Sequence, residues 1–170
     1  MANTDEEISR LVDKLLEGEI VLPDIQRDYV WSGSQIPKFS DSLKNGWPIG
    51  SLLLWETALE VPTKPAAVIQ RQNPPTRPSV LLDGQQRLTT LARIFRPDAT
   101  PKGERILDVR YNPLLREFRN ANAVERRNPA WILVSEFVGA GAQFRDVVRR
   151  SKIANTQAKE IWFISCRTRN

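Results

Sequence analysis

The chain has 170 residues, and 41% of them are hydrophobic, which suits one globular domain with a buried core. It contains no histidine, which excludes Ser-His-Asp machinery, zinc sites with histidine ligands and nucleases that depend on a histidine base. The net charge of +5 and the pI near 9.7 favour an anionic partner, a nucleotide or nucleic acid. A solvated basic surface explains the same charge equally well.

The sequence predicts a cytoplasmic protein with no membrane segment. Its apolar runs fall far short of the ~18 residues that a membrane span needs. The N-terminus, MANTDEEISR, is acidic and lacks the apolar centre of a signal peptide. The single cysteine, Cys166, cannot form an internal disulfide, which agrees with a reducing compartment.

The N-terminal segment predicts an amphipathic helix, because apolar residues recur at helical spacing over residues 4–18. Thr4 and Glu7 are placed as a capping box at its start, and Gly18 is its expected end. The short apolar run at residues 19–22 then predicts a strand, because the proline that follows it ends the run.

A second helix is predicted over residues 34–45, where Gly46 closes an amphipathic pattern. The apolar run SLLLW, residues 51–55, is too short for a typical helix and predicts a buried strand. Trp47 and Trp55 are expected to be core residues rather than functional ones.

Residues 58–78 are rich in proline and charge and predict a surface loop, with an edge strand at residues 66–70. Residues 79–83 predict a further strand, and residues 85–95 a helix. Four residues of that helix are expected to face the core: Leu88, Leu91, Ala92 and Phe95.

Residues 106–112 alternate enough to predict one more strand, and the remainder of the chain is basic and predicted to be helical. The fold class expected from this order is α+β, with a small mixed sheet flanked by helices. We expect one domain over residues 1–137, with residues 138–170 as a basic helical segment that begins a further helical region.

The stretch VLLDGQQRLTTL places polar residues where a strand turns into a helix. A helix N-terminus exposes unpaired backbone N–H groups and is a ready anion site. Gly84 allows close approach of a phosphate, and Arg87 adds a charged planar fork suited to phosphate oxygens. Asp83 can hold Mg²⁺ or position a water or a ribose hydroxyl, while Gln85 and Gln86 supply amides.

A purely structural interpretation of this stretch carries similar weight, because Asp83 followed by Gln86 is also a good capping box. That interpretation leaves the glycine and the arginine of the first turn unexplained. No GxxxxGK[ST] pattern occurs anywhere in the chain, so a nucleotide site here would use a cradle other than a P-loop.

The second motif is PDIQRDYVW, residues 23–31, which follows a predicted strand. Gln26, Arg27, Tyr29 and Trp31 together could stack on a base, bond its edge and hold a phosphate. We expect Gln26, Tyr29 and Trp31 to sense DNA. The alternative is that the aromatic residues pack the loop onto the core while Arg27 makes a structural ion pair.

The succession PDIQRDYVW, NGWPIGSLLLWE and VLLDGQQRLTTL resembles the N-terminal domain of GmrSD-type modification-dependent restriction enzymes. The resemblance covers roughly residues 20–95 and extends more weakly to about residue 137. The fold of this family is similar to that of the ParB and sulfiredoxin-like superfamily, whose GxxR turn binds nucleotide phosphates. Gly84 and Arg87 match that turn.

The resemblance implies a domain that binds and hydrolyses a nucleoside triphosphate with Mg²⁺ and couples recognition of modified DNA to a nuclease. Asp83 and Arg87 would then be catalytic, with Asp83 as the metal ligand. Nucleotide contacts would come from both motifs: Gln26, Arg27, Gly84, Gln85, Gln86 and Arg87.

The nuclease of complete members is an HNH-type domain that needs histidine, so this chain resembles a partial member and is not expected to be a nuclease by itself. A partner chain or a further domain would supply that activity. Two alternatives remain open: a ParB-like DNA-binding switch that binds nucleotide without significant turnover, and an inactive, truncated interaction module.

Overall fold

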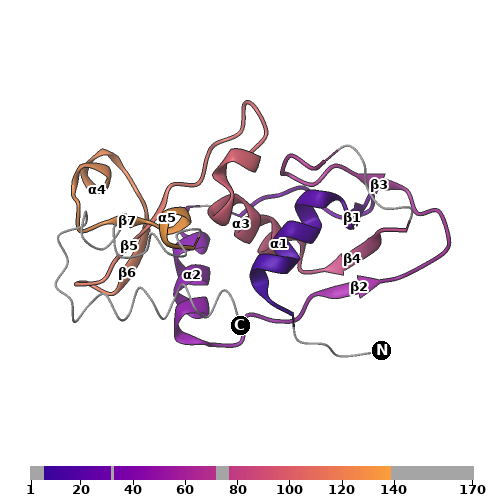
Figure 1. The fold of residues 1–170 in the computed structure, drawn as a ribbon, viewed down its shortest axis with the longest axis horizontal. Helices are drawn as coiled ribbons and strands as arrows, with labels where there is room; N and C mark the ends of the chain where they lie inside the picture. Colours follow the sequence, from indigo (N-terminus) through magenta and orange to yellow (C-terminus); the bar gives the residue numbers. More distant parts are fainter. Residues whose placement is uncertain (1–5, 32, 72–76, 139–170) are drawn as a thin grey trace. The chain divides into compact units, whose positions relative to one another are not determined.

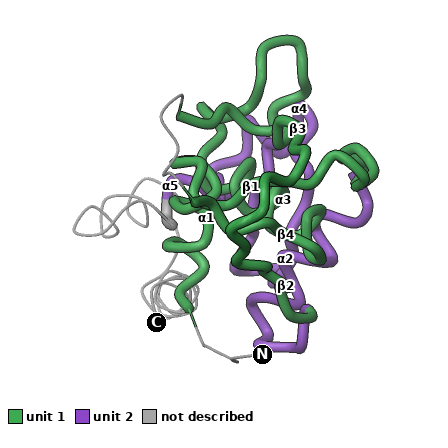
Figure 2. Tube along the Cα trace, turned by 90° about the vertical axis from the view of Figure 1, so that its right-hand side faces the viewer, with its two compact units in different colours: residues 1–31, 50–106 green, residues 32–49, 107–170 purple. Residues whose placement is uncertain are grey.

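The structure is a computed structural model that describes residues 6–31, 33–71 and 77–138, and its fold is α+β, as predicted. The chain forms two compact units that alternate along the sequence (Figure 2). Unit 1 comprises residues 1–31 and 50–106, and unit 2 comprises residues 32–49 and 107–170. The predicted basic helical segment, residues 138–170, lies outside the described residues apart from residue 138.

Unit 1 is built on a mixed sheet of four strands with the order β2-β4-β1-β3 (Figure 1). These strands are β1 (Ile20–Pro23), β2 (Leu53–Trp55), β3 (Thr63–Lys64) and β4 (Ser79–Asp83). The central pair, β1 and β4, is parallel, and the two edge strands are antiparallel to their neighbours. Because β1 and β4 run in the same direction, the polar motifs that follow them leave the sheet at the same edge.

Two helices of unit 1, α1 (Ile8–Glu17) and α3 (Gln85–Phe95), pack against each other (Figure 1). Leu15 of α1, Leu81 of β4 and Leu88 of α3 are fully buried in this unit. Each such leucine contributes roughly 1.5–3 kcal/mol by leaving water. This core fixes α3 directly behind the end of β4, with the short 3-10 helix η1 (Pro97–Ala99) after it.

Local sequence explains where the first two helices end. Gly18 and Gly46 close α1 and α2 (Gln35–Asn45) in the left-handed conformation, as predicted. The start of α1 differs from the prediction, since Glu7 is the N-cap and makes no side-chain capping bond. The proposed capping partner Thr4 lies outside the described residues.

Unit 2 contains a second sheet that the sequence did not predict, an antiparallel one with the order β6-β5-β7. Its strands are β5 (Val109–Asn112), β6 (Glu117–Asn120) and β7 (Ile132–Leu133), with the short helices α4 (Ala123–Arg127) and α5 (Val134–Val138). Helix α2 packs on β6. The core includes Ile36 and Tyr111, and the Tyr111 ring lies 4.6 Å from that of Phe118.

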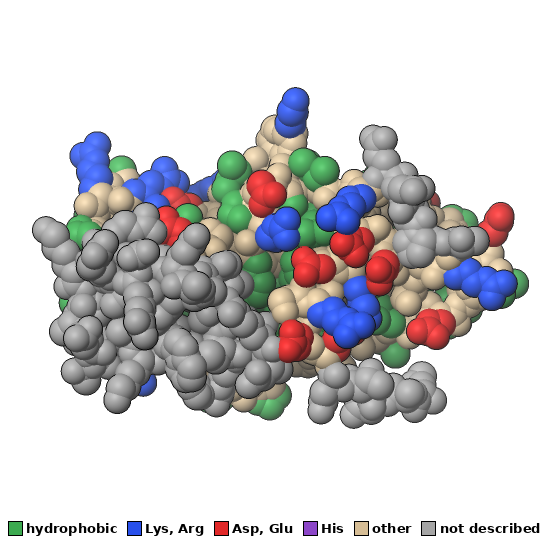
Figure 3. Space-filling view, in the orientation of Figure 1, with side chains coloured by type: hydrophobic (Ala, Val, Ile, Leu, Met, Phe, Trp, Pro, Cys, Tyr) green, Lys and Arg blue, Asp and Glu red, His purple; other side chains and the backbone are tan. Residues whose placement is uncertain are grey.

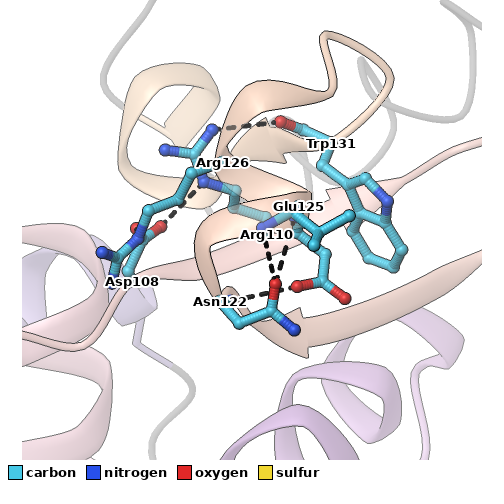
Figure 4. Close-up of polar contacts among 7 residues, drawn as sticks. Asp108, Arg110, Asn122, Glu125, Arg126 and Trp131 are labelled. Atoms are coloured by element: carbon cyan, nitrogen blue, oxygen red, sulfur yellow. Dashed lines mark hydrogen bonds and ion pairs between the residues drawn. The ribbon is translucent and has the colours of Figure 1, made fainter.

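A polar network fixes the end of unit 2 that carries α4 (Figure 4). Asp108 accepts from both Arg110, at 2.8 Å, and Arg126, at 2.6 Å. Asn122 and Glu125 form a capping box at the start of α4, and the Asn122 backbone N–H that donates to the carboxylate lowers the pKa of Glu125. These contacts are structural and account for four charged residues of this unit.

Several predictions about exposure were wrong. The run at residues 51–55 forms only the three-residue strand β2, which is an edge strand, so Trp55 is 40% exposed rather than buried. Trp47 is 59% exposed, because it follows the end of α2. Residues 66–70 do not form the predicted edge strand; the edge strand of this region is β3, at residues 63–64. On α3, Ile94 is buried, whereas Phe95, which was predicted to face the core, is half-buried.

Basic and acidic side chains are mixed on the face shown in Figure 3, over the part of unit 1 that contains α1. Glu6 pairs with Arg10 and Lys14, and Glu17 pairs with Arg71. Each of these basic side chains therefore has an acidic neighbour. Among the described residues, no helix combines the length and the apolar character that crossing a membrane would require.

Candidate functional site

A cavity of about 310 Å³ opens in unit 1 at the edge where β1 and β4 both end. The structure brings the two sequence motifs together in its wall. The lining residues are Gln26, Arg27, Trp31, Leu82, Asp83, Gly84, Gln85, Gln86 and Arg87. The parallel pairing of β1 and β4 explains this meeting, because it delivers both motifs to one edge.

The N-terminus of α3 forms the floor of this cavity. Gly84 is the N-cap, with a φ of 97°, and a Cβ at this position would lie 2.2 Å from Cδ2 of Leu52. Only glycine tolerates both this conformation and this contact. No side chain caps the helix, so the proposed Asp83–Gln86 capping box is wrong, and the first N–H groups of α3 are left for another acceptor.

Asp83 pairs instead with Arg87, one turn later, with 3.0 Å between Oδ2 and Nη2. The Arg87 side chain is 16% exposed, whereas that of Asp83 is 72% exposed. Gly50 contributes to this arrangement, because a Cβ there would lie 2.5 Å from Nη1 of Arg87. The sequence gives no signal for this contact, because it joins residues that are far apart in the chain.

The two glutamines of the motif have different surroundings. Gln86 donates from Nε2 to the carbonyl of Asp28 and accepts through Oε1 from the N–H of Val30, both at 2.9 Å. Gln86 also lines the cavity, and through these two bonds its side-chain amide holds the loop at residues 24–31. Gln85 is only 6% exposed as a whole residue, and it lines the cavity.

Further contacts fasten the loop at residues 24–31. Gln26 lies in the cavity wall and donates to the carbonyl of Leu81. Lys64 of β3 donates to the carbonyl of Gln26 and pairs with Asp28 at 2.9 Å. Sequence reasoning did not identify Lys64, since nothing in its local pattern distinguishes it from other surface lysines.

Tyr29 faces α3 and is not among the residues that line the cavity. Its hydroxyl hydrogen-bonds Thr90 Oγ1 at 2.9 Å, and the Arg93 guanidinium lies 5.0 Å from its ring centre. Burial raises the pKa of Tyr29 above its usual value. The geometry thus supports the packing alternative for Tyr29, whereas Gln26, Arg27 and Trp31 do border the cavity.

The side chains of the cavity wall could help to hold a cation that is also bound by a ligand, but they are too few to hold a cation by themselves. Asp83 is the one carboxylate in the cavity wall, and the described residues contain no cluster of three potential metal-binding side chains. Mg²⁺ is commonly held by one or two carboxylates together with substrate phosphates and waters. Asp83 would supply the protein ligand in such an arrangement.

Comparison with known proteins gives two matches. The family model described as "GmrSD restriction endonuclease, N-terminal domain" matches residues 8–164. An uncharacterized protein of Methanocaldococcus jannaschii is 41% identical over 88 residues, which is 48% of this chain. The match spans 15% of the length of that archaeal protein.

Proposed function

Because the chain belongs to the family of GmrSD restriction endonuclease N-terminal domains, we propose that unit 1 is a cytoplasmic sensor that binds a nucleoside triphosphate with Mg²⁺ and hydrolyses it. It would serve a restriction or phage-defence system that acts on modified DNA. The observation that supports this most is the convergence of the α3 N-terminus, Arg87 and the loop residues Gln26 and Arg27 on one cavity.

The phosphates would lie at the N-terminus of α3. Gly84 permits their approach, and the backbone N–H groups of Gln85 and Gln86 are placed to donate to them. Arg87 would neutralise phosphate charge with its planar fork, and Asp83 would hold Mg²⁺ or position a water. Mg²⁺, when bound, would neutralise phosphate oxygens. These assignments agree with a ParB and sulfiredoxin-like GxxR turn, a relationship that forms part of the proposal.

Gln26, Arg27 and Trp31 would contact the rest of the ligand. The Trp31 ring offers a stacking surface, and Arg27 adds a second positive charge to the cavity wall. The same three residues would be the contact to DNA if the nucleotide occupies only the α3 side. A nuclease would come from a further domain or a partner chain.

One observation favours a second candidate, a nucleotide-binding switch without significant turnover. Hydrolysis needs a group that orients or deprotonates the attacking water. The one carboxylate of the cavity wall, Asp83, is already paired with Arg87. Phosphate release measured with ATP and GTP, with and without modified DNA, separates the two candidates.

Nucleotide binding is tested with the Arg87→Ala variant and titration calorimetry in the presence of Mg²⁺. Loss of a charge-assisted contact should weaken ATP or GTP binding about tenfold or more. The melting temperature without nucleotide is measured beside it, because Asp83 stays solvated but the Arg87 side chain is only 16% exposed, so the loss of its packing must be separated from the loss of binding. Arg96→Ala is the matched control, since Arg96 is 51% exposed and does not line the cavity.

Two results would contradict the proposal. One is a wild-type chain that neither binds ATP or GTP nor gains melting temperature with either of them, which would favour an inactive interaction module. The other is an Arg87→Ala chain that binds nucleotide as tightly as the Arg96→Ala control.

A further inference from the structure

Three buried polar side chains form a line along α3. Gln86, Thr90 and Arg93 lie four and then three residues apart, so they share one face of the helix. They are 8%, 0% and 3% exposed, respectively. Polar groups are costly to bury unless they are bonded, so a line of this kind needs partners from another part of the fold.

The loop at residues 24–31 supplies partners to this line, and Tyr29 lies at the centre of the contact. Gln86 bonds the residues on either side of Tyr29. Thr90 donates to the Gln86 carbonyl at 2.7 Å, so the Tyr29 hydroxyl is the donor in its 2.9 Å bond to Thr90 Oγ1. The Arg93 guanidinium lies 5.0 Å from the centre of the Tyr29 ring. All three side chains of the line therefore hold Tyr29 or its immediate neighbours.

Arg93 is the charged member of the line, and its charge is balanced from outside the helix. Nη1 donates to Glu104 Oε2 and Nη2 donates to the Arg105 carbonyl, both at 2.7 Å. Nε is buried and has no hydrogen-bond partner among the described residues. Within the described part of the chain, Glu104 is the one carboxylate that pairs with Arg93. Without it, a guanidinium that is 3% exposed would remain as an uncompensated buried cation.

We infer that Glu104 is a positioning residue, which acts through Arg93 and Tyr29 to hold the loop in the arrangement that lines the cavity. A buried guanidinium that loses its carboxylate is drawn toward water, and its departure removes the cation–π contact that holds the ring. Tyr29 itself does not border the cavity, whereas loop residues two and three positions away from it do. The consequence for ligand affinity rests on the proposed function, but the consequence for the loop does not.

The first measurement is amide hydrogen exchange by NMR on the chain without ligand, read at Val30, whose N–H donates to Gln86. Glu104→Ala should speed exchange at Val30 about tenfold or more, because the loop opens when the buried cation leaves. Arg71, whose N–H donates to the Leu16 carbonyl, should exchange at the wild-type rate. Equal acceleration at both sites would indicate a general loss of stability and would overturn the inference.

Glu17→Ala is the matched control. Glu17 also pairs with an arginine, at 3.0 Å, and its side chain is 40% exposed against 43% for Glu104. Its partner arginine is 74% exposed, so no buried cation is left behind. Exchange at Val30 should therefore not change in this variant, and an acceleration equal to that of Glu104→Ala would refute the inference.

A double-mutant cycle tests whether the effect passes through the tyrosine ring. Tyr29→Leu removes the ring that Arg93 faces. In that background, Glu104→Ala should have almost no further effect on exchange at Val30, because the contact is already lost. Two factors that multiply independently would show that Glu104 acts by another route. Glu104→Gln keeps the shape of the side chain and removes its charge, so it gives the same comparison if Glu104→Ala fails to fold.

The second measurement is binding of ATP and GTP with Mg²⁺ by titration calorimetry. Affinity depends on the fraction of molecules whose loop lines the cavity, so it should fall about threefold or more in Glu104→Ala. It should stay at the wild-type value in Glu17→Ala. Faster exchange at Val30 with unchanged affinity would overturn the role of Glu104 at the cavity. A wild-type chain that binds neither nucleotide would remove the proposed function, and the exchange rates alone would then decide whether Glu104 holds the loop.

Discussion

Arg87 occupies the space that a side chain at position 50 would take, since a Cβ on Gly50 would lie 2.5 Å from Nη1 of Arg87. Gly50 has a φ of 85°, so both its conformation and its contact favour glycine. A residue 37 positions earlier in the chain thus helps to set the orientation of the guanidinium.

Gly50→Ala should therefore weaken nucleotide binding about tenfold, because the new methyl group displaces the guanidinium from the cavity. The measurement is calorimetric titration with Mg²⁺ and ATP or GTP. Gly103→Ala is a matched control, since Gly103 has a φ of 89° and open space within 4 Å of its Cβ position. Both variants should lose about 1 kcal/mol of stability from backbone strain. Equal affinities in the two variants would show that Gly50 does not position Arg87.

Gln86→Leu should lower the free energy of unfolding by about 1–3 kcal/mol, because the Asp28 carbonyl and the Val30 N–H lose their partner. Urea unfolding measures this loss. Gln85→Leu is the comparison, because Gln85 lines the cavity and is not one of the residues seen to hold the loop: stability should stay nearly level, while affinity for nucleotide falls. The opposite pattern would mean that the roles of the two glutamines are reversed.

Stability should fall as the pH rises above about 10, in part through Tyr29. Burial raises the pKa of Tyr29, so between the unfolded and folded pKa values the unfolded chain loses this proton and the folded chain keeps it. The contribution is present below the unfolded pKa and is lost as the pH rises through the folded one. Urea unfolding from pH 8 to 11 should show a shallower decline for Tyr29→Phe than for the wild type. Identical slopes would refute this assignment.

The chain alone should not cut DNA. It has no histidine, and the described residues contain no group of three potential metal-binding side chains. Modified plasmid incubated with the purified chain and Mg²⁺ or Mn²⁺ should stay intact, with a complete family member as the positive control. Cleavage activity that persists at constant specific activity through successive purification steps would disprove this.

Much of unit 1 was predictable because local signals agree with its fold. The glycine that ends α1, the strand at residues 79–83 and the helix after it all match the sequence patterns. The family was also predictable, since the order of short motifs is specific and the family model matches residues 8–164.

The distinction between the two glutamines was not predictable, because it depends on which residue caps α3. Successive residues on a helix point about 100° apart, so a small shift of the helix start exchanges their surroundings. With Gly84 as the cap, Gln85 lines the cavity as a buried side chain and Gln86 reaches the loop. The contact of Gly50 with Arg87 was also not predictable, because it depends on packing between residues far apart in the chain. The exposure of β2 was missed because an apolar run has the same pattern in an edge strand as in a central strand.

The interleaving of the two units has a consequence for how the cavity could respond to events elsewhere. The chain leaves unit 1 after Trp31 and returns at Gly50, with α2 in between. Trp31 lines the cavity, and Gly50 adjoins Arg87. Mechanical tension applied through α2 would therefore reach unit 1 first at two residues beside the cavity.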